Sequence, residues 1–322
     1  MIMDTSSGLF VVSANPHIRT PRTTASIMLD VIIALCPVTI AALFLFGWRT
    51  LAVVLTSIAV CVLSEFIFNL IAKKPRTIQD LSAVVTGLIL ALNVPVGIPL
   101  WQLALGAVLS IVVVKGLFGG IGQNFANPAL VGRIVIFLSF SSAMAAPTQD
   151  FASLVGIDMV SSATPLSQLN QGDPSSFTFV QLLFGTYGGM LGETCSLALL
   201  AGLVYLLIRR VITWHIPVSI IGTVALCSLI AGRGVVADLL SGGLLLGAIF
   251  MATDYATSPV TKWGKIVYGV GIGLVTMFVR IFCVFPEGIS FAILLFNILT
   301  PYIEKLTFVR PFGVPKGGKR HE

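Results

Sequence analysis

The sequence predicts an all-α polytopic membrane protein of ten transmembrane segments, arranged as two inverted five-helix repeats with both termini cytoplasmic. Three observations lead to this prediction. Of the 322 residues, 56% are hydrophobic and only 10% are charged, which excludes an ordinary soluble domain. Apolar runs long enough to cross a hydrocarbon layer of about 30 Å recur along the whole chain. Lysine and arginine residues gather in alternate connecting stretches.

Polar or Gly/Pro-rich stretches separate the ten apolar segments, several of which are shorter than the roughly 20 residues of a full crossing helix. The predicted segments are residues 26–46, 50–72, 81–94, 98–115, 127–140, 193–209, 215–231, 238–253, 264–283 and 288–304. The chain divides into a cytoplasmic N-terminal segment (1–25), a first five-helix repeat (26–140), an extracytoplasmic loop (141–192), a second five-helix repeat (193–305) and a basic cytoplasmic tail (306–322). Residues 1–25 are polar, so no cleavable signal peptide is expected.

The orientation follows from the basic residues. With the N-terminus inside, 15 of the 19 lysines and arginines fall in cytoplasmic stretches, and three (Arg49, Arg233 and Arg280) fall outside. Because positive residues are retained on the cytoplasmic side, both termini are expected inside and loop 141–192 outside. The formal charge of +6 is spread along the chain, so no nucleic-acid partner is expected.

The two halves are predicted to be inverted repeats. Five segments precede the long loop and five follow it, and a repeat with an odd number of spans must insert upside down the second time. Residues 86–90 of the third segment also parallel residues 241–245 of the eighth. Each is followed by a helix-breaking stretch, 93–95 in one and 254–259 in the other. Broken helices at matching positions of two halves usually flank a central site.

A glycine-rich stretch, residues 115–128, is too polar for a lipid-facing helix. Asn127 followed by Pro128 is typical of a helix start, with Asn as the N-cap and Pro in the first turn. A helix N-terminus that points into a cavity favours an anion such as a phosphate. The alternative is a tight re-entrant turn whose polar groups bond to one another.

Ionisable residues inside membrane segments are costly and indicate function. Glu65 lies well inside the second segment, and Asp254 follows the break after the eighth. We therefore expect Asp254, and next to it in priority Glu65, to lie on an ion pathway. The five cysteines are scattered singly and form no CxxC pair, so no metal site is expected.

Residues 158–164, Asp-Met-Val-Ser-Ser-Ala-Thr, lie in the longest polar stretch. They resemble the flavinylation signature Asp-x-x-(Ser/Thr)-Gly-Ala-Thr, in which a flavin transferase joins the phosphate of FMN to the last threonine through a phosphoester bond. Asp158, Ser161, Ala163 and Thr164 match, and Thr164 would carry the FMN. Ser162 stands where the signature has glycine, which suits a tightly approached backbone better. The alternative is a Ser/Thr-rich surface turn before a proline.

Further motifs extend over nearly the whole chain. They are residues 13–17, 81–87, 91–93, 118–124, 127–129, 192–194, 241–243, 251–255 and 285–288. Through this ordered set the chain resembles the RnfD subunits of Rnf ion-translocating electron-transport complexes, which are related to NqrB of the sodium-pumping NADH:quinone oxidoreductase. The length suits RnfD better, because NqrB usually carries a longer N-terminal extension.

The resemblance implies a urea-transporter-like fold, in agreement with the topology above, in a multi-pass subunit of a bacterial cell (inner) membrane. It implies electron transfer between reduced ferredoxin and NAD+ coupled to movement of Na+ or H+, by a complex in which this subunit is not catalytic alone. The implied partners are other membrane subunits, a second flavin-bearing subunit, iron–sulfur subunits, the flavin transferase and membrane lipid.

The resemblance also implies cofactors. Beside covalent FMN on Thr164, comparison with NqrB implies a second, non-covalent flavin (riboflavin) within the bundle. Asn127, Arg133 and the backbone amides of residues 119–128 are the candidates for a flavin pocket. The protein would tune the flavin potential through hydrogen bonds and nearby charge.

Two other functions are compatible with this fold, because fold alone does not decide function. One is a small-solute channel or transporter of the urea-transporter type without a redox role. The other is a scaffold whose flavin is absent. Thr164 discriminates among the three, since a channel has no need of a flavinylation signature in an exterior loop.

Overall fold

The computed structural model describes residues 22–73, 77–145, 165–170, 178–283 and 288–308. Every regular element in these ranges is helical, which confirms the all-α prediction. Among them, α1, α2, α13 and α14 are long and apolar enough to cross a membrane, and five shorter apolar helices accompany them. The helices therefore have the lengths and composition of a polytopic membrane protein.

The first half of the chain begins with a helical hairpin. Its elements are α1 (Thr24–Phe46), α2 (Arg49–Ile71), the 3-10 turn η1 (Ile78–Asp80), α3 (Ser82–Leu92), α4 (Leu100–Leu109), its π-helical continuation η2 (Ser110–Gly116), α5 (Pro128–Ser139) and α6 (Ser141–Met144). The hydroxyl of Thr23 caps α1 by accepting the Ser26 N–H. Gly47 ends α1 with a φ of 75°, a left-handed value that glycine adopts readily, and α2 starts after Trp48.

Helix α3 is short and almost completely buried. It lies close against α2 because Gly87 has no side chain: a Cβ there would lie 2.8 Å from the Cα of Ile58. The Ser57 hydroxyl reinforces this contact by donating to the Gly87 carbonyl at 2.7 Å. The helix stops at Asn93, whose side chain donates to the Ile89 carbonyl at 2.7 Å. The helix break predicted at residues 93–95 is therefore confirmed.

The second half contains a helix in several pieces. Its elements are α7 (Pro165–Asn170), α8 (Phe179–Phe184), α9 (Ser196–Ile208), α10 (His215–Ile230), α11 (Val235–Leu240), α12 (Leu244–Leu246), the π-helical η3 (Gly247–Met251), α13 (Lys262–Phe282) and α14 (Ile289–Thr307). The eighth predicted segment is thus divided into α11, α12 and η3. The break occurs at Gly242, with a φ of 59°. Arg280 of α13 donates to the carbonyls of Asp238 and Ser241 at 2.5 and 3.2 Å, which satisfies acceptors freed by the break.

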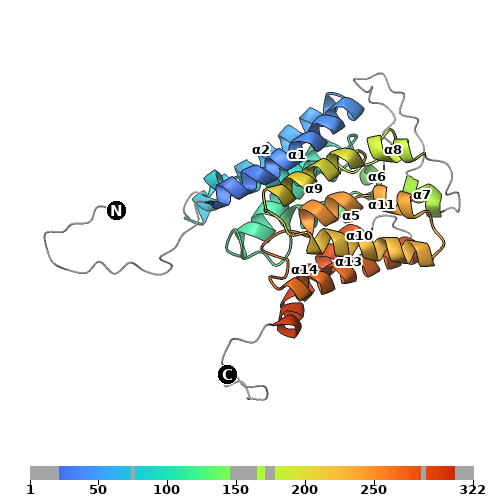
Figure 1. Ribbon diagram of the computed structural model, residues 1–322. Helices are drawn as coiled ribbons and strands as arrows, with labels where there is room; N and C mark the ends of the chain where they lie inside the picture. The colour runs from blue at the N-terminus through green and yellow to red at the C-terminus, as the bar shows by residue number, and fades with distance from the viewer. Residues whose placement is uncertain (1–21, 74–76, 146–164, 171–177, 284–287, 309–322) are drawn as a thin grey trace, which may run out of the picture.

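Helices of the first half of the chain pack against helices of the second half. Helix α1 packs against α9, and α5 packs against α14. Within each half the second helix packs on the third and the fourth: α2 on α3 and α4, and α10 on α11 and α13. In Figure 1, α1 begins and α14 ends on the same side of the bundle, whereas α6, α7 and α8 lie on the opposite side.

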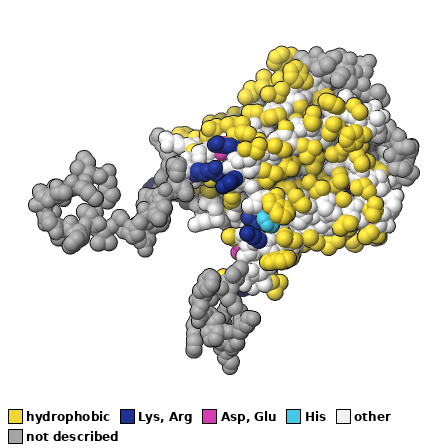
Figure 2. Space-filling view, in the orientation of Figure 1, with side chains coloured by type: hydrophobic (Ala, Val, Ile, Leu, Met, Phe, Trp, Pro, Cys, Tyr) yellow, Lys and Arg dark blue, Asp and Glu magenta, His cyan; other side chains and the backbone are white. Residues whose placement is uncertain are grey.

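The surface of the bundle is largely apolar. Hydrophobic side chains cover its flank in Figure 2, whereas lysine and arginine side chains gather at the end where α1 begins. Large side chains such as Leu70 and Ile230 are 68% and 84% exposed. A patch this extended on a soluble monomer would be unusual, and here it matches a surface that faces lipid or partner subunits.

Candidate functional site

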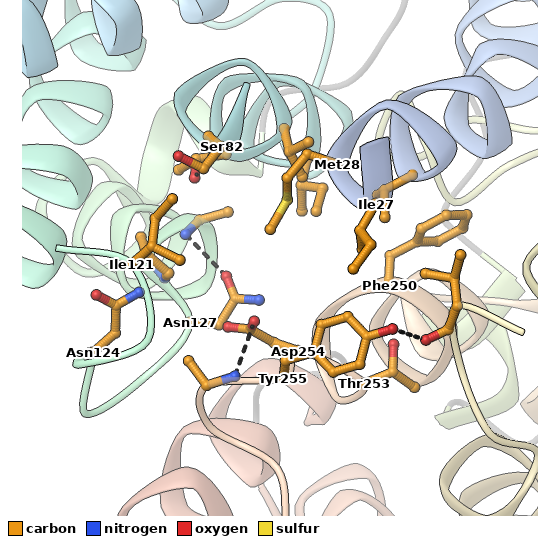
Figure 3. Close-up of a pocket in the computed structure, with 18 of the residues that line it drawn as sticks. Ile27, Met28, Ser82, Ile121, Asn124, Asn127, Phe250, Thr253, Asp254 and Tyr255 are labelled. Carbon is orange, nitrogen blue, oxygen red and sulfur yellow. Dashed lines mark hydrogen bonds between the residues drawn. The ribbon is translucent and has the colours of Figure 1, made fainter. Parts of the chain in front are cut away.

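A cavity of about 290 Å³ lies where the two halves of the bundle meet. Its walls come from α1, α3, η2, the loop before α5, the end of α9, and η3 with the turn that follows it. Figure 3 shows Ile27 and Met28 of α1 across the open space from Asn127 and Asp254. Apolar walls with a few polar groups are the usual form of a small-molecule site.

Asn127 joins the two halves at this cavity. Its side-chain oxygen caps α5 by accepting the N–H groups of Ala129 and Leu130 at 3.0 and 3.3 Å. Its side-chain nitrogen donates to the carbonyl of Met251, the last residue of η3, at 3.4 Å. The predicted helix start at Asn127 and Pro128 is confirmed, and the start of α5 faces the cavity.

Asp254 lies in the turn after η3, beside Asn127 in Figure 3. Its carboxylate accepts the N–H of Ala256 at 3.4 Å. The Thr300 hydroxyl of α14 donates to the Thr257 carbonyl at 2.8 Å and holds the same turn in place. Burial raises the pKa of Asp254 above its ordinary value, although hydrogen bonds from the backbone and from Thr257 oppose this effect. The structure thus places the predicted ion-pathway residue on the cavity wall.

Polar side chains also hold together the wall formed by α1 and α9. The Asp30 carboxylate of α1 accepts hydrogen bonds from Tyr205 at 3.1 Å and from Arg209 at 3.2 and 3.3 Å. The Tyr255 hydroxyl, beyond η3, donates to the Val211 carbonyl, as Figure 3 shows. These contacts connect three separate parts of the chain at one edge of the cavity.

Glu65, the second predicted ion-pathway residue, lies behind the cavity wall. Its carboxylate forms an ion pair with Lys115 of η2 at 2.7 Å, and both side chains are 5% exposed. The Lys115 ammonium also donates to the Ser82 hydroxyl of α3 at 2.6 Å. Lys115 and Ser82 both line the cavity, so Glu65 is connected to it through one side chain.

Arg133 does not line this cavity. It lies further along α5, is 4% exposed, and donates to the hydroxyl of Ser290 at the start of α14. The negative charge of the nearby Glu193 carboxylate attracts the guanidinium of Arg133. Of the two side chains predicted for a flavin pocket, only Asn127 therefore faces the open space.

Thr164 and the motif residues Asp158, Ser161 and Ala163 lie outside the described residues. The structure resumes at the next residue, Pro165, which begins α7. Helix α7 packs against α11, and its Leu166 is 1% exposed.

Sequence reasoning missed Lys115, Ser82 and Tyr255 as residues of the site. Lys115 is one of the 15 basic residues expected on the cytoplasmic side, whereas η2 carries it into the bundle, where it is 4% exposed. A signal was available: a glutamate inside a membrane segment requires a partner, and Lys115 is a basic residue at the edge of another segment. Arg280, which was counted with the outer connections, is likewise buried within α13.

Comparison with known proteins finds a family and relatives that match nearly the full length of the chain. The model of the NQR2, RnfD, RnfE family matches residues 11–313. The chain is 44% identical over 309 residues to the D-type subunit of the Na(+)-translocating ferredoxin:NAD(+) oxidoreductase complex of Acetobacterium woodii, covering 95% of this chain and 96% of that protein.

Two further relatives carry related names. The D-type subunit of the proton-translocating ferredoxin:NAD(+) oxidoreductase complex of Clostridium ljungdahlii is 36% identical over 321 residues, covering 95% of this chain and 96% of that protein. The D-type subunit of the ion-translocating oxidoreductase complex of Escherichia coli K12 is 33% identical over 351 residues, covering 96% of this chain and the whole of that protein.

Proposed function

Because this chain belongs to the NQR2, RnfD, RnfE family, we propose that it is the RnfD-type subunit of an ion-translocating ferredoxin:NAD+ oxidoreductase complex. The observation that carries this proposal is a match over nearly the full length to relatives named for that activity. The protein is not catalytic alone. It works with other membrane subunits, a second flavin-bearing subunit and iron–sulfur subunits, and the complex moves Na+ or H+. The small-solute channel loses support, because the relatives are named as oxidoreductase subunits.

The proposed topology has ten spans in two inverted repeats, with both termini cytoplasmic, in the bacterial inner membrane. Equivalent helices pair across the two halves, α1 with α9 and α5 with α14, as a two-fold relation requires. Helix α1 also begins, and α14 ends, on the side where lysine and arginine side chains gather, opposite to α6, α7 and α8. These features support an extracytoplasmic position for loop 141–192.

We propose that a flavin transferase attaches FMN to Thr164 through a phosphoester bond and that Asp158, Ser161 and Ala163 serve its recognition. When bound, FMN supplies electron transfer in single steps. The contribution of this chain is to hold the attachment point beside the bundle. Helix α7 begins one residue after Thr164 and is anchored by Leu166, so the tether is short.

The cavity at the centre of the bundle fits the second flavin that the family resemblance implies. Its walls are mostly apolar and suit a flat heterocycle, while Asn127, Asn124 and Ser82 offer hydrogen-bonding groups at its edge. Its one lysine, Lys115, is already paired with Glu65, so a phosphate would lack a free cationic partner among the described lining residues. The site therefore suits a flavin that carries no phosphate. Asn127 would hold it, and Arg133 would not contact it.

The attachment of FMN is tested by fluorescence of the denatured protein in a gel, with the flavin transferase co-expressed. We expect a fluorescent band for the wild type and for Thr178→Ala, which removes a hydroxyl from the same loop, and none for Thr164→Ala. Mass spectrometry of the peptide that spans residues 158–166 identifies the modified side chain. An unmodified threonine in the wild-type complex would refute the covalent relay.

A further inference from the structure

A second, smaller cavity of about 40 Å³ lies beside the first. It is lined by Glu65, Phe68, Asn69, Thr77, Ile111, Lys115, Gly116, Gly119 and Gly120. Lys115 lines both cavities, so its side chain forms the partition between them. A volume of this size holds about one water molecule or one small ion.

The two oxygens of the Glu65 carboxylate have different surroundings. Oε1 accepts hydrogen bonds from Lys115 at 2.7 Å and from Thr77 at 2.5 Å. Oε2 is buried and has no hydrogen-bond partner among the described residues. A buried carboxylate oxygen without a hydrogen-bond partner is costly in a low-dielectric interior. Glu65 Oε2 would therefore be stabilised by a ligand in the cavity beside it.

The backbone around Lys115 keeps this cavity open. Lys115 lies in the π-helical η2, and such irregular turns occur often at functional sites. The turn that follows contains Gly119 and Gly120, with φ values of 118° and 108° that other residues rarely adopt. A Cβ at Gly120 would meet only open space, whereas one at Gly116 would lie 2.9 Å from the Phe68 ring.

Lys115 can release Glu65 without becoming unsatisfied. Its ammonium also donates to the Ser82 hydroxyl at 2.6 Å, and this oxygen belongs to α3 rather than to α2. A cation beside Glu65 would repel the ammonium and replace it as the counter-charge of the carboxylate. The lysine would then keep its bond to Ser82 and face the larger cavity.

We propose that Glu65 and the small cavity bind one monovalent cation, Na+ or a hydrated proton, and that the Lys115 ammonium is its internal competitor. Carboxylate and backbone oxygens are suitable ligands for such hard cations. The proposal deepens the proposed function by naming a cation site, and it rests on the chain being part of an ion-translocating complex. Because Lys115 lines both cavities, occupancy of this site changes the charge that the larger cavity presents.

The test uses the purified whole complex and measures its thermal midpoint in two titrations. NaCl is varied against choline chloride at fixed pH and ionic strength, and pH is varied at low sodium. We expect the wild type to be stabilised by one of the two cations, and Glu65→Gln to lose that response. Lys115→Met removes the competitor and should lower the half-saturating cation concentration about tenfold. Arg233→Met, which breaks a separate pair with Asp238 and lines neither cavity, is the matched control and should leave the response unchanged.

A purely structural ion pair predicts the opposite outcome for the lysine variant: Lys115→Met would lower stability at every cation concentration without changing the half-saturating value. That result, or a wild type that responds to neither cation because only water fills the cavity, would overturn the proposal.

Should Lys115→Met fail to assemble, the wild type provides a second readout. A carbodiimide that modifies buried carboxyl groups should label Glu65, with protection by the stabilising cation, and labelling that ignores the cation would also count against the site. Ferredoxin-dependent NAD+ reduction, measured on the same preparation, tests the proposed function separately.

Discussion

The Asn127 side chain donates to the Met251 carbonyl at 3.4 Å across 124 residues of sequence. Asn127 caps α5 in the first half of the chain, and Met251 ends η3 in the second. One amide thus fixes a helix start of one half against a helix end of the other, beside Asp254 and the central cavity (Figure 3). The shape of the cavity therefore depends on a contact between the two halves.

Asn127→Ala should lower the stability of the complex by about 1 kcal/mol, the usual loss for an N-cap, with a further loss from the contact to Met251. Asn127→Asp keeps the capping oxygen but not the nitrogen that donates to Met251. In thermal unfolding, Asn127→Asp should be less stable than the wild type, because it loses the donor to Met251 and adds a negative charge beside that carbonyl and Asp254. A stability of Asn127→Ala equal to that of the wild type would show that neither the cap nor the contact to Met251 contributes.

Asp254→Asn should reduce ion transport more than electron flow, because it removes the charge on the cavity wall while preserving the shape of the side chain. The measurement compares Na+ or H+ uptake into vesicles with NAD+ reduction by the same preparation. An equal loss of both activities, or absence of the protein from the membrane, would indicate a structural role instead.

Asp254 should also make stability depend on pH. Since burial raises its pKa in the folded protein, its protonated form is favoured by folding. This contribution is complete below the ordinary carboxyl pKa of about 3.9 and is lost as pH rises through the raised value. Asp254→Asn, which resembles the protonated form, should therefore gain stability relative to the wild type as pH increases. A stability difference that stays constant with pH would contradict this.

Gly192→Ala should destabilise the bundle by roughly 1–3 kcal/mol, because an added methyl group overpacks the centre. A Cβ there would lie 2.6 Å from the Cβ of Leu92, and the Gly192 N–H donates to the Leu92 carbonyl at 2.7 Å. Gly222→Ala in α10 is the control, since its Cβ meets nothing within 4 Å. We expect the control to unfold at the wild-type temperature or above it.

The proposed orientation predicts opposite labelling of two sites. After replacement of the native cysteines, a cysteine at Gln181 in α8 should react with a membrane-impermeant maleimide in intact spheroplasts, whereas one at Lys262 should react only after lysis. Both positions are exposed. The reverse pattern would place both termini outside and loop 141–192, with the proposed FMN site at Thr164, inside the cell.

The positions of the helices could be predicted well from the sequence. Each of the ten predicted segments contains helix, and the breaks near Asn93 and after Met251 occur where stretches with polar residues and a proline interrupt the apolar runs. The break at Gly242 was not predicted, although the two adjacent glycines of residues 242–243 are the local signal for it. The short helices α6, α7 and α8 within loop 141–192 were also missed.

The composition of the site was less predictable. Asn127 and Asp254 were identified because a helix cap and a carboxylate after a helix break are local patterns. Arg133 is one of the candidates for a flavin pocket, but α5 turns it toward Ser290 and away from the central cavity. Its distance from the cavity depends on the rotation of the helix, which no short pattern encodes.

The membrane environment, the helical segments, the family and the presence of costly charges inside the bundle could all be inferred from the order of the amino acids. The packing of the folded chain sets which charges pair: Lys115 with Glu65 across 50 residues, and Arg280 with the Asp238 carboxylate across 42. Hydropathy and capping are properties of neighbours along the chain, whereas an ion pair depends on where packing brings distant backbones. For that reason the partition formed by Lys115 between two cavities emerged only from the folded bundle.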